Sequence, residues 1–164
     1  ANVPDAQASM ETMFSMMAAV TSGTNVVYHA AGWLEGGLCA SYEKFIIDCE
    51  MLQNFQAYLK PMVVDDGTLA FDAMKEVGHN GHFFGIQHTQ DRYTTAFYQP
   101  FLSDWRNYEA WEAAGGVWTA QRAHQIGQDI IESYEPPPMD ESLREELAGF
   151  VERRKSEGGA PTDF

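Results

Sequence analysis

The chain has 164 residues, of which 45% are hydrophobic and 13% aromatic, and it carries a formal net charge of −14. This composition indicates a globular domain rather than a disordered chain, and the lack of a membrane-length apolar run or an N-terminal signal predicts a soluble, cytoplasmic protein. The acidic balance argues against a nucleic-acid partner, because phosphate binding needs a basic face.

The first part of the chain is predicted to form a helix and then a strand. Apolar residues recur at helical spacing over 5–21, and we expect them to form a core face, although a methionine stripe also suits an adaptable binding groove. The residues of that face are Met10, Met13, Phe14, Met17 and Val20. Residues 25–29, Asn-Val-Val-Tyr-His, form the one convincing strand, and a glycine-rich loop follows over 31–37.

A second helix is predicted over 41–60, where Pro61 ends it. Its inward stripe consists of Phe45, Cys49, Leu52 and Leu59. The two cysteines of the chain, Cys39 and Cys49, lack Cys-x-x-Cys spacing. We therefore expect reduced thiols that lie in or near the core.

The second half of the chain is predicted to be helical as well. Asp65 or Asp66 caps a helix that runs to Val77, with Leu69 and Ala73 also facing inward. A histidine-containing loop and an aromatic segment over 93–111 precede a helix over 119–134. Residues 136–138 are three prolines, which form a stiff spacer. Beyond them Asp140 caps a last amphipathic helix, with Leu143, Leu147, Phe150 and Val151 on one side, and the tail over 158–164 is expected to be disordered.

The pattern is thus mostly helical, with one or few strands. A single strand leaves its backbone donors and acceptors without partners, which buried groups must find. Residues 25–29 therefore imply neighbouring strands that the remaining sequence hardly supplies. The chain looks like part of a larger α/β fold.

Three of the five histidines lie close together, at His79, His82 and His88. A cluster of this kind is a candidate metal site, but His-x-x-His alone is a weak signal, because zinc sites on helices prefer two histidines four apart. The flanking Gly78, Asn80 and Gly81 indicate a turn. We therefore expect no metal ligands here, with His82 and His88 bonded to the backbone.

The stronger candidate site follows the predicted strand, at Tyr28, His29, Trp33 and Glu35. Residues just beyond the carboxyl ends of barrel strands form active sites. Two aromatic faces and a carboxylate suit a methylated ammonium, whose methyl groups cannot donate strong hydrogen bonds and which is held by cation–π contact instead. The competing interpretation places Tyr28 and Trp33 in the core, with His29 as a satisfied buried histidine.

An ordered set of motifs over residues 3–135 resembles the C-terminal part of the trimethylamine methyltransferase family of corrinoid-dependent enzymes. The motifs are Pro4-Asp-Ala-Gln-Ala8, Ala30-Ala-Gly-Trp-Leu-Glu35, Val64-Asp-Asp-Gly-Thr-Leu-Ala70, Lys75-Glu-Val-Gly78, Gly81-His-Phe83, His88-Thr89 and Trp111-Glu-Ala-Ala-Gly-Gly116. The resemblance implies an α/β fold, a TIM (β/α)8 barrel, of which residues 1–135 are the C-terminal part. Residues 136–164 then form a proline-rich spacer, a helix and a flexible tail.

The resemblance also implies a reaction. In the family a methyl group moves from a methylated amine, such as trimethylamine or glycine betaine, to the Co(I) corrinoid of a separate carrier protein. His29, Tyr28 and Trp33 become candidate substrate contacts, and Glu35 a candidate catalytic acid, which matters for a tertiary amine because that leaving group needs a proton. A full barrel needs about 250 residues, so most barrel strands are missing here. No pyrrolysine is present, which favours the branch acting on quaternary amines.

Two further classes of function remain open. A non-catalytic helical binding or assembly module explains the acidic surface and the shortage of strands without a missing barrel. A small histidine-liganded metalloprotein is the third possibility. If the chain is part of a barrel, we expect it to hide its open edge by forming a homo-oligomer.

Overall fold

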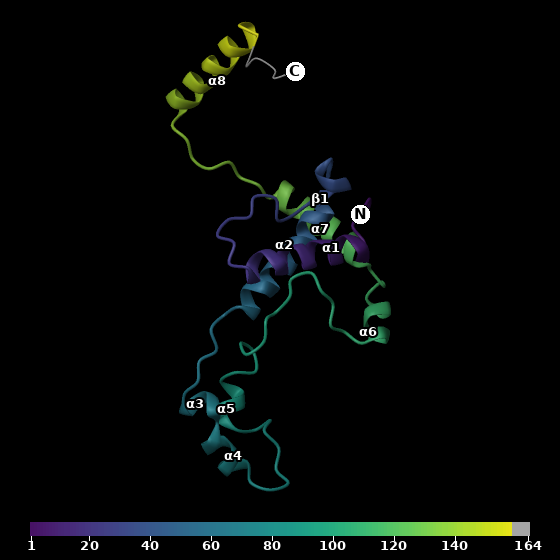
Figure 1. The fold of residues 1–164 in the computed structure, drawn as a ribbon, viewed down its shortest axis with the longest axis vertical. Coiled ribbons are helices and arrows are strands. Elements are labelled where there is room, and N and C mark those ends of the chain that lie inside the picture. Colours follow the sequence, from purple (N-terminus) through teal and green to yellow (C-terminus); the bar gives the residue numbers. More distant parts are fainter. Residues whose placement is uncertain (159–164) are drawn as a thin grey trace. The chain divides into compact units, whose positions relative to one another are not determined.

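The computed structural model describes residues 1–158, and the tail predicted to be disordered lies outside them except for Gly158. The chain divides into two compact units, Ala1–Ile130 and the residues from Ile131 on. The described residues are mostly helical, as predicted, with one small sheet of two strands (Figure 1). That the first 135 residues belong to a barrel stays a prediction.

The first unit is built around helix α2 (Tyr42–Tyr58), which Ser41 caps by accepting a hydrogen bond from the Lys44 amide. Helix α1 (Ala6–Thr21), capped by Asp5, packs against α2. Ile46 of α2 forms the buried core with Leu102 and with Ala123 of α7 (Thr119–Glu132). All three helices confirm the predicted ranges to within a few residues.

The predicted strand over 25–29 is wrong. Residues 25–29 have no regular structure, and the sheet lies further on, where β1 (Trp33–Leu34) pairs antiparallel with β2 (Cys39–Ala40). The one-turn 3-10 helix η1 (Glu35–Gly37) joins the two strands into a tight hairpin. The β-branched pair Val26 and Val27 indicated a strand, but the chain that follows doubles back at once and leaves these residues exposed.

Helix α2 buries a different face from the one predicted. Phe45 and Leu59 are about half exposed, whereas Lys44, Asp48 and Glu50 are buried. The hydropathy pattern placed the apolar residues inward. Each buried charge, however, has a partner from another segment: Thr12 for Lys44, the Gly32 amide for Asp48 and the Leu102 amide for Glu50. These bonds remove most of the penalty that keeps charges outside. Cys39 is also exposed, so only Cys49 lies near the core, and burial raises the pKa of its thiol.

The methionine face of α1 is not the core face that its spacing predicted. Met10 and Phe14 are more than half exposed, and Met13 and Met17 are only partly covered. The buried residues of α1 are Ala8 and Met16, which lie two turns apart. In the described chain α2 covers one side of α1, so the helix buries a narrow stripe.

Residues 65–92 form a group of short helices. Asp65 begins α3 (Asp66–Leu69) with a capping box to Thr68, and Ala70, at φ +56°, breaks the predicted single helix before α4 (Phe71–Val77). Helix α5 (Gln87–Gln90) carries His88. Ala73 and Ile86 are buried here, while Leu69 is not. The helix predicted from Asp65 or Asp66 to Val77 is therefore present as two shorter ones.

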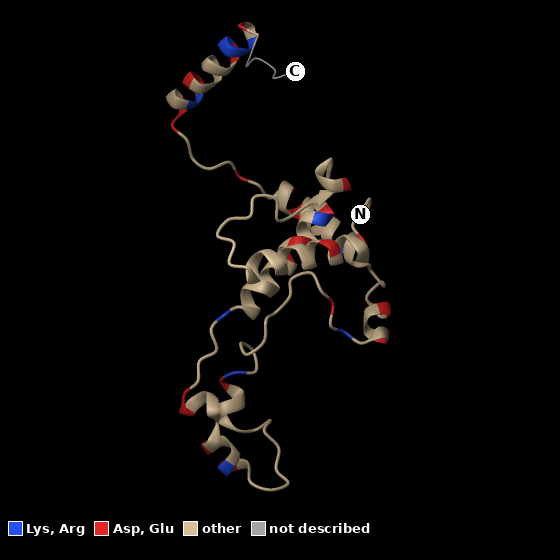
Figure 2. Cartoon of the chain, in the orientation of Figure 1, with Lys and Arg blue, Asp and Glu red and all other residues tan. Residues whose placement is uncertain are grey.

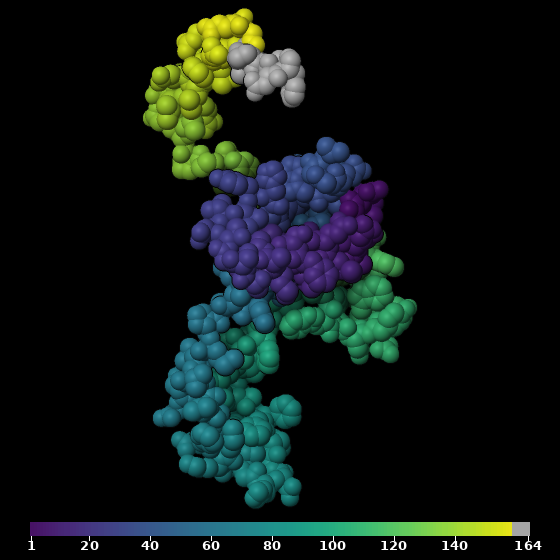
Figure 3. All heavy atoms as spheres, in the orientation of Figure 1, coloured from purple at the N-terminus to yellow at the C-terminus, as the bar shows by residue number. Residues whose placement is uncertain are grey.

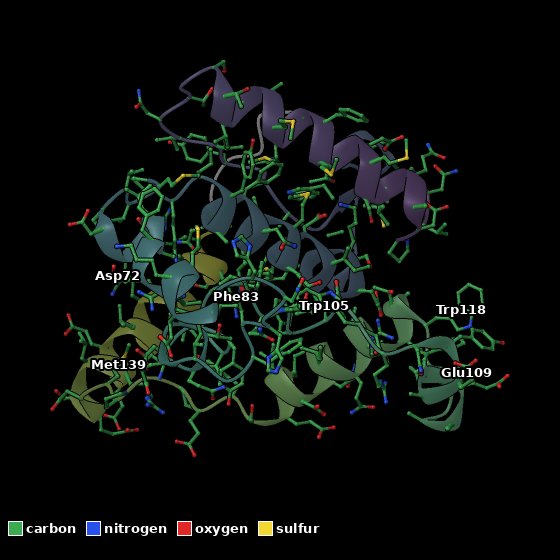
Figure 4. The ribbon with its side chains drawn as sticks, turned by 90° about the horizontal axis from the view of Figure 1, so that it is seen from below. Asp72, Phe83, Trp105, Glu109, Trp118 and Met139 are labelled. Carbon is green, nitrogen blue, oxygen red and sulfur yellow. The ribbon has the colours of Figure 1, made fainter. Side chains whose placement is uncertain are left out.

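The aromatic segment ends in helix α6 (Tyr108–Ala113), which Asn107 caps. Trp111 of α6 donates its indole N–H to the Val117 carbonyl at 3.1 Å, and this bond closes the turn at Gly115 and Gly116. Trp105 and Trp118, labelled in Figure 4, are both largely exposed.

The second unit contains the predicted proline spacer without helix or strand, followed by α8 (Glu141–Ser156). Asp140 caps α8, and bonds from the Ser142 hydroxyl and from two backbone amides lower the pKa of its carboxyl. Three basic residues in the last turn of α8 complement the helix dipole (Figure 2). None of the helices within residues 1–158 has the length and hydropathy needed to cross a membrane.

Candidate functional site

A cavity of about 320 Å³ lies between α1 and the loop that contains the β1–β2 hairpin. Three of the four residues singled out in the sequence line it, namely His29, Trp33 and Glu35. Figure 3 shows the surface hollowed between the purple residues of α1 and the blue residues of the loop. The cavity is at the small end of the range for ligand pockets, which suits a compact molecule.

His29 and Trp33 form one wall of this cavity. Their rings stack at 5.2 Å between centroids with only 19° between the planes. The four-residue separation places the two rings together because the chain turns at Gly32, where φ is +85°. The stack offers an aromatic face that is partly open to solvent, since Trp33 is 41% exposed.

Glu35 follows β1 and lies on the same rim. Its φ of +52° falls in the left-handed region that residues other than glycine rarely adopt. The backbone tolerates this because the Glu35 amide donates to the Ala1 carbonyl at 2.9 Å and the next two residues are glycines with positive φ. Left-handed residues of this kind concentrate at functional sites.

Tyr28 is the predicted site residue that does not line the cavity. Its side chain is 91% exposed, and it is not among the cavity residues. Tyr28 was expected at the end of a strand over 25–29, and it does not lie at a strand end because that strand does not form. Its role as a substrate contact stays a prediction that this geometry does not support.

A buried ion pair forms the floor of the cavity. The Lys44 ammonium bonds both oxygens of Asp48 at 2.5 Å and the Thr12 hydroxyl at 2.6 Å, and both charged side chains are only 1% exposed. Asp48 also accepts the Gly32 amide at 2.9 Å. Asp48 and Thr12 line the cavity.

Sequence reasoning did not find Lys44, Asp48 or Thr12. A Lys and an Asp four residues apart are the usual sign of an exposed helix pair, so their type and spacing gave no reason to place them inside. The sequence holds no signal for the acceptor either, because the burial of the Gly32 amide that needs it is seen only in the folded chain.

The cavity is acidic at its rim and floor. Glu11 joins Glu35 and Asp48 among its lining residues, and the Glu11 carboxylate accepts a hydrogen bond from the Gln7 side-chain amide at 2.7 Å. Lys44 is the one cation that contacts Asp48 in the described chain, and it lies beneath the lining. Lys44 neutralises Asp48, so the aromatic wall and the carboxylates of Glu11 and Glu35 are the features that attract a small cation.

The histidines of the loop over 79–88 do not form a comparable site. His88 bonds the Gly67 carbonyl through Nε2 at 3.0 Å, as predicted. The backbone bond predicted for His82 is wrong: within residues 1–158 the contact of its side chain is with Phe84, at 5.8 Å between ring centroids. Within residues 1–158, no three His, Cys, Asp or Glu side chains gather in a group that could hold a metal ion.

The geometry thus defines a compact site suited to a small organic cation, next to a helical core with a two-stranded hairpin. A model of the trimethylamine methyltransferase (MTTB) family matches residues 1–159, and the chain belongs to this family.

Three relatives show how the chain compares. It is 40% identical over 155 residues to a glycine betaine methyltransferase of Desulfitobacterium hafniense strain Y51. The aligned residues cover 94% of this chain and 32% of that protein. The chain is 35% identical to the trimethylamine methyltransferase MttB of D. hafniense strain DCB-2, over 96% of this chain and 31% of the relative. A trimethylamine methyltransferase MttB of Methanosarcina barkeri (strain Fusaro) is 28% identical, over 93% of this chain and 30% of the relative. The chain therefore spans about a third of these relatives' length.

Proposed function

We propose that the chain carries part of the amine-binding site of a methyltransferase that moves a methyl group from a tertiary or quaternary methylamine to the Co(I) corrinoid of a partner protein. The observation that carries the proposal is the His29–Trp33 stack beside Glu35 on one small cavity. Membership of the family and the names of the relatives, which act on trimethylamine or glycine betaine, support it. On this proposal the chain is the C-terminal part of a TIM barrel and acts in the cytoplasm.

The residues of the site have separate tasks. The Trp33 ring faces the methyl-bearing nitrogen, where cation–π attraction replaces the hydrogen bonds that a methylated ammonium cannot make. His29 fixes the tryptophan ring by stacking and has a ring N–H to offer to a substrate carboxylate or hydroxyl. With a quaternary substrate Glu35 supplies negative charge at the rim, and with a tertiary substrate its carboxyl acts as the acid that gives the leaving amine a proton.

The corrinoid itself does not fit this cavity, because about 320 Å³ is too small to enclose a corrin ring and its side chains. The proposal therefore keeps the cofactor on the carrier protein, where it supplies the nucleophile. The part played by this chain is to hold the amine in place and to exclude water from one side of it. No step is assigned to residues beyond the cavity.

Calorimetric titration of the 164-residue chain tests the proposal. Tetramethylammonium, trimethylamine and glycine betaine are the probes, and Trp33→Ala, His29→Ala and Tyr28→Ala are the variants. We expect saturable binding to the wild-type chain, a loss of about 10-fold in affinity for Trp33→Ala, and no change for the exposed control Tyr28→Ala. Equal affinities in the wild type and Trp33→Ala, or no binding of any probe, would contradict it.

A second candidate function, a helical binding or assembly module, is favoured by one observation. An apolar groove of about 450 Å³ runs between α1 and α2, lined by Met13, Met17, Met51, Phe55 and Tyr58 among others. On this view the chain self-associates through the groove. Sedimentation velocity of the wild type and of Met17→Glu tests this second function. A concentration-dependent dimer in the wild type that is lost in Met17→Glu supports an assembly module. A monomer in both forms contradicts it.

A further inference from the structure

The loop that holds the candidate site has an internal anchor. Gly32 lies in the turn between His29 and Trp33, directly before Trp33, and its amide donates to Asp48 Oδ2 at 2.9 Å while its carbonyl accepts the Ser41 amide at 2.9 Å. Both partners of Gly32 belong to the first turns of α2 or to its cap. The turn between the two stacked rings is therefore tied to one helix on both sides.

The anchor has little freedom to shift. Gly32 adopts φ +85°, and a Cβ placed there would lie 3.2 Å from the Phe45 Cβ, so the backbone of the loop approaches α2 closely. The Asp48 carboxylate is in turn fixed by Lys44, whose ammonium also bonds Thr12 of α1. The chain of contacts joins α1, α2 and the loop through groups that are 1% exposed.

A buried ion pair is not needed for stability as such. Replacing such a pair by neutral residues of similar size is often neutral or stabilising, because the pair must first lose its hydration. What Asp48 provides is a hydrogen-bond acceptor in a fixed position for the Gly32 amide, and a hydrophobic residue cannot provide one.

We propose that Lys44 and Asp48 are positioning residues for the amine site, with Asp48 fixing the Gly32 turn that stacks His29 on Trp33 and Lys44 fixing Asp48. The proposal deepens the proposed function and rests on it where ligand binding is concerned. Neither residue transfers a proton or touches the reacting atoms in this scheme. Their effect on binding passes through the geometry of the loop.

Two matched double variants test it. Lys44→Met with Asp48→Asn removes both charges but keeps a side-chain oxygen able to accept the Gly32 amide. Lys44→Met with Asp48→Leu removes both charges and the acceptor. Because neither variant leaves a lone buried charge, both are expected to fold. The Leu variant leaves the buried Gly32 amide without an acceptor, so its midpoint in urea unfolding followed by circular dichroism is expected to lie below that of the Asn variant, and the α1 amides correct the exchange data for this global difference.

Two measurements are then compared between the variants: hydrogen exchange of the Gly32 amide by NMR, with amides of α1 as the internal control, and calorimetric affinity for tetramethylammonium. We expect the Asn variant to keep slow Gly32 exchange and an affinity within about 3-fold of wild type. The Leu variant is expected to lose protection at Gly32 by at least about 10-fold and affinity by a similar factor. Equal Gly32 exchange in the two variants would overturn the proposal.

The two readouts also separate this proposal from the proposed function. If no chain binds tetramethylammonium but Gly32 exchange differs as expected, the anchor stands and the amine site fails. If the wild type binds and both double variants bind equally well, the amine site stands and the positioning role is overturned.

Discussion

Two regions of the first unit carry the residues that stand out in the sequence, and they differ in how those residues are held. Around the hairpin, His29 and Trp33 stack over a buried Lys44–Asp48 pair that reaches both α1 and α2. Around α3–α5, His82 is exposed, and His88 makes a single bond to a nearby carbonyl. The comparison teaches that a cluster of conspicuous residue types is held in a fixed arrangement only where buried partners fix the geometry.

The largest expected effect tests the buried pair. Asp48→Ala leaves the Lys44 ammonium without its counter-charge at a position that is 1% exposed, so we expect the free energy of unfolding to fall by about 3–5 kcal/mol, measured by urea denaturation. The matched control is Asp72→Ala, whose pair with Lys75 is fully on the surface. A change as small in Asp48→Ala as in Asp72→Ala would mean that the hairpin region is no better organised than α3–α5.

A second effect in the same region concerns Glu50. Its carboxylate accepts the backbone amides of Leu102 and Ser103 and the Ser103 hydroxyl, and so ties α2 to the segment before α6. Glu50→Ala leaves a buried amide without an acceptor, and we expect a loss of about 2 kcal/mol in unfolding free energy. Ser103→Ala removes the hydroxyl alone and is expected to cost less. If Ser103→Ala costs as much as Glu50→Ala, the backbone bonds are not what holds this segment.

The third prediction is a pH dependence. The Ser41 hydroxyl, and after it His124 at 2.8 Å, lower the pKa of Glu43 from 4.5 to about 2. Because the folded pKa is depressed, the stabilisation is complete above about pH 4.5 and is lost as the pH falls towards 2. Thermal unfolding of Glu43→Gln should therefore show a shallower decline over this window than the wild type.

The control for this pH effect is Glu145→Gln, which makes the same chemical change on α8, in the other unit. Its decline between pH 4.5 and 2 is expected to follow the wild type. A decline in Glu43→Gln that is as steep as in the wild type would show that Glu43 does not join α7 to α2.

The smallest effect belongs to the histidine region. His88→Ala removes the bond to Gly67 and is expected to lower the unfolding free energy by no more than about 1 kcal/mol, since the bond is exposed. His82→Ala should leave both stability and the content of bound zinc, measured by atomic absorption, unchanged. Stoichiometric zinc in the wild type that is lost in His82→Ala would reverse the comparison between the two regions.

Sequence periodicity located the long helices well, because caps such as Asp5, Ser41 and Asp140 and the stops at glycine or proline are local signals. It placed the wrong face of α2 inward, since the burial of Lys44 and Asp48 depends on partners from α1 and from the loop. Local pattern cannot contain that information.

Three of the four residues singled out in the sequence lie together, and their roles stay a prediction. His29, Trp33 and Glu35 share the cavity even though the strand expected to place them does not form, because the turn at Gly32 brings the same residues together. Tyr28 was misplaced for the same reason, as its position depended on strand geometry. The cavity floor was missed, because charges on a helix are ordinarily exposed.

The most direct test of the central claim is an NMR titration of the 164-residue chain with tetramethylammonium, observing the indole N–H signals of its four tryptophans. The account predicts a saturable shift of the Trp33 signal, assigned from Trp33→Phe, with the signals of Trp105, Trp111 and Trp118 unchanged. Shifts confined to Trp111 or Trp118, or no shift at Trp33 at saturating ligand, would contradict it.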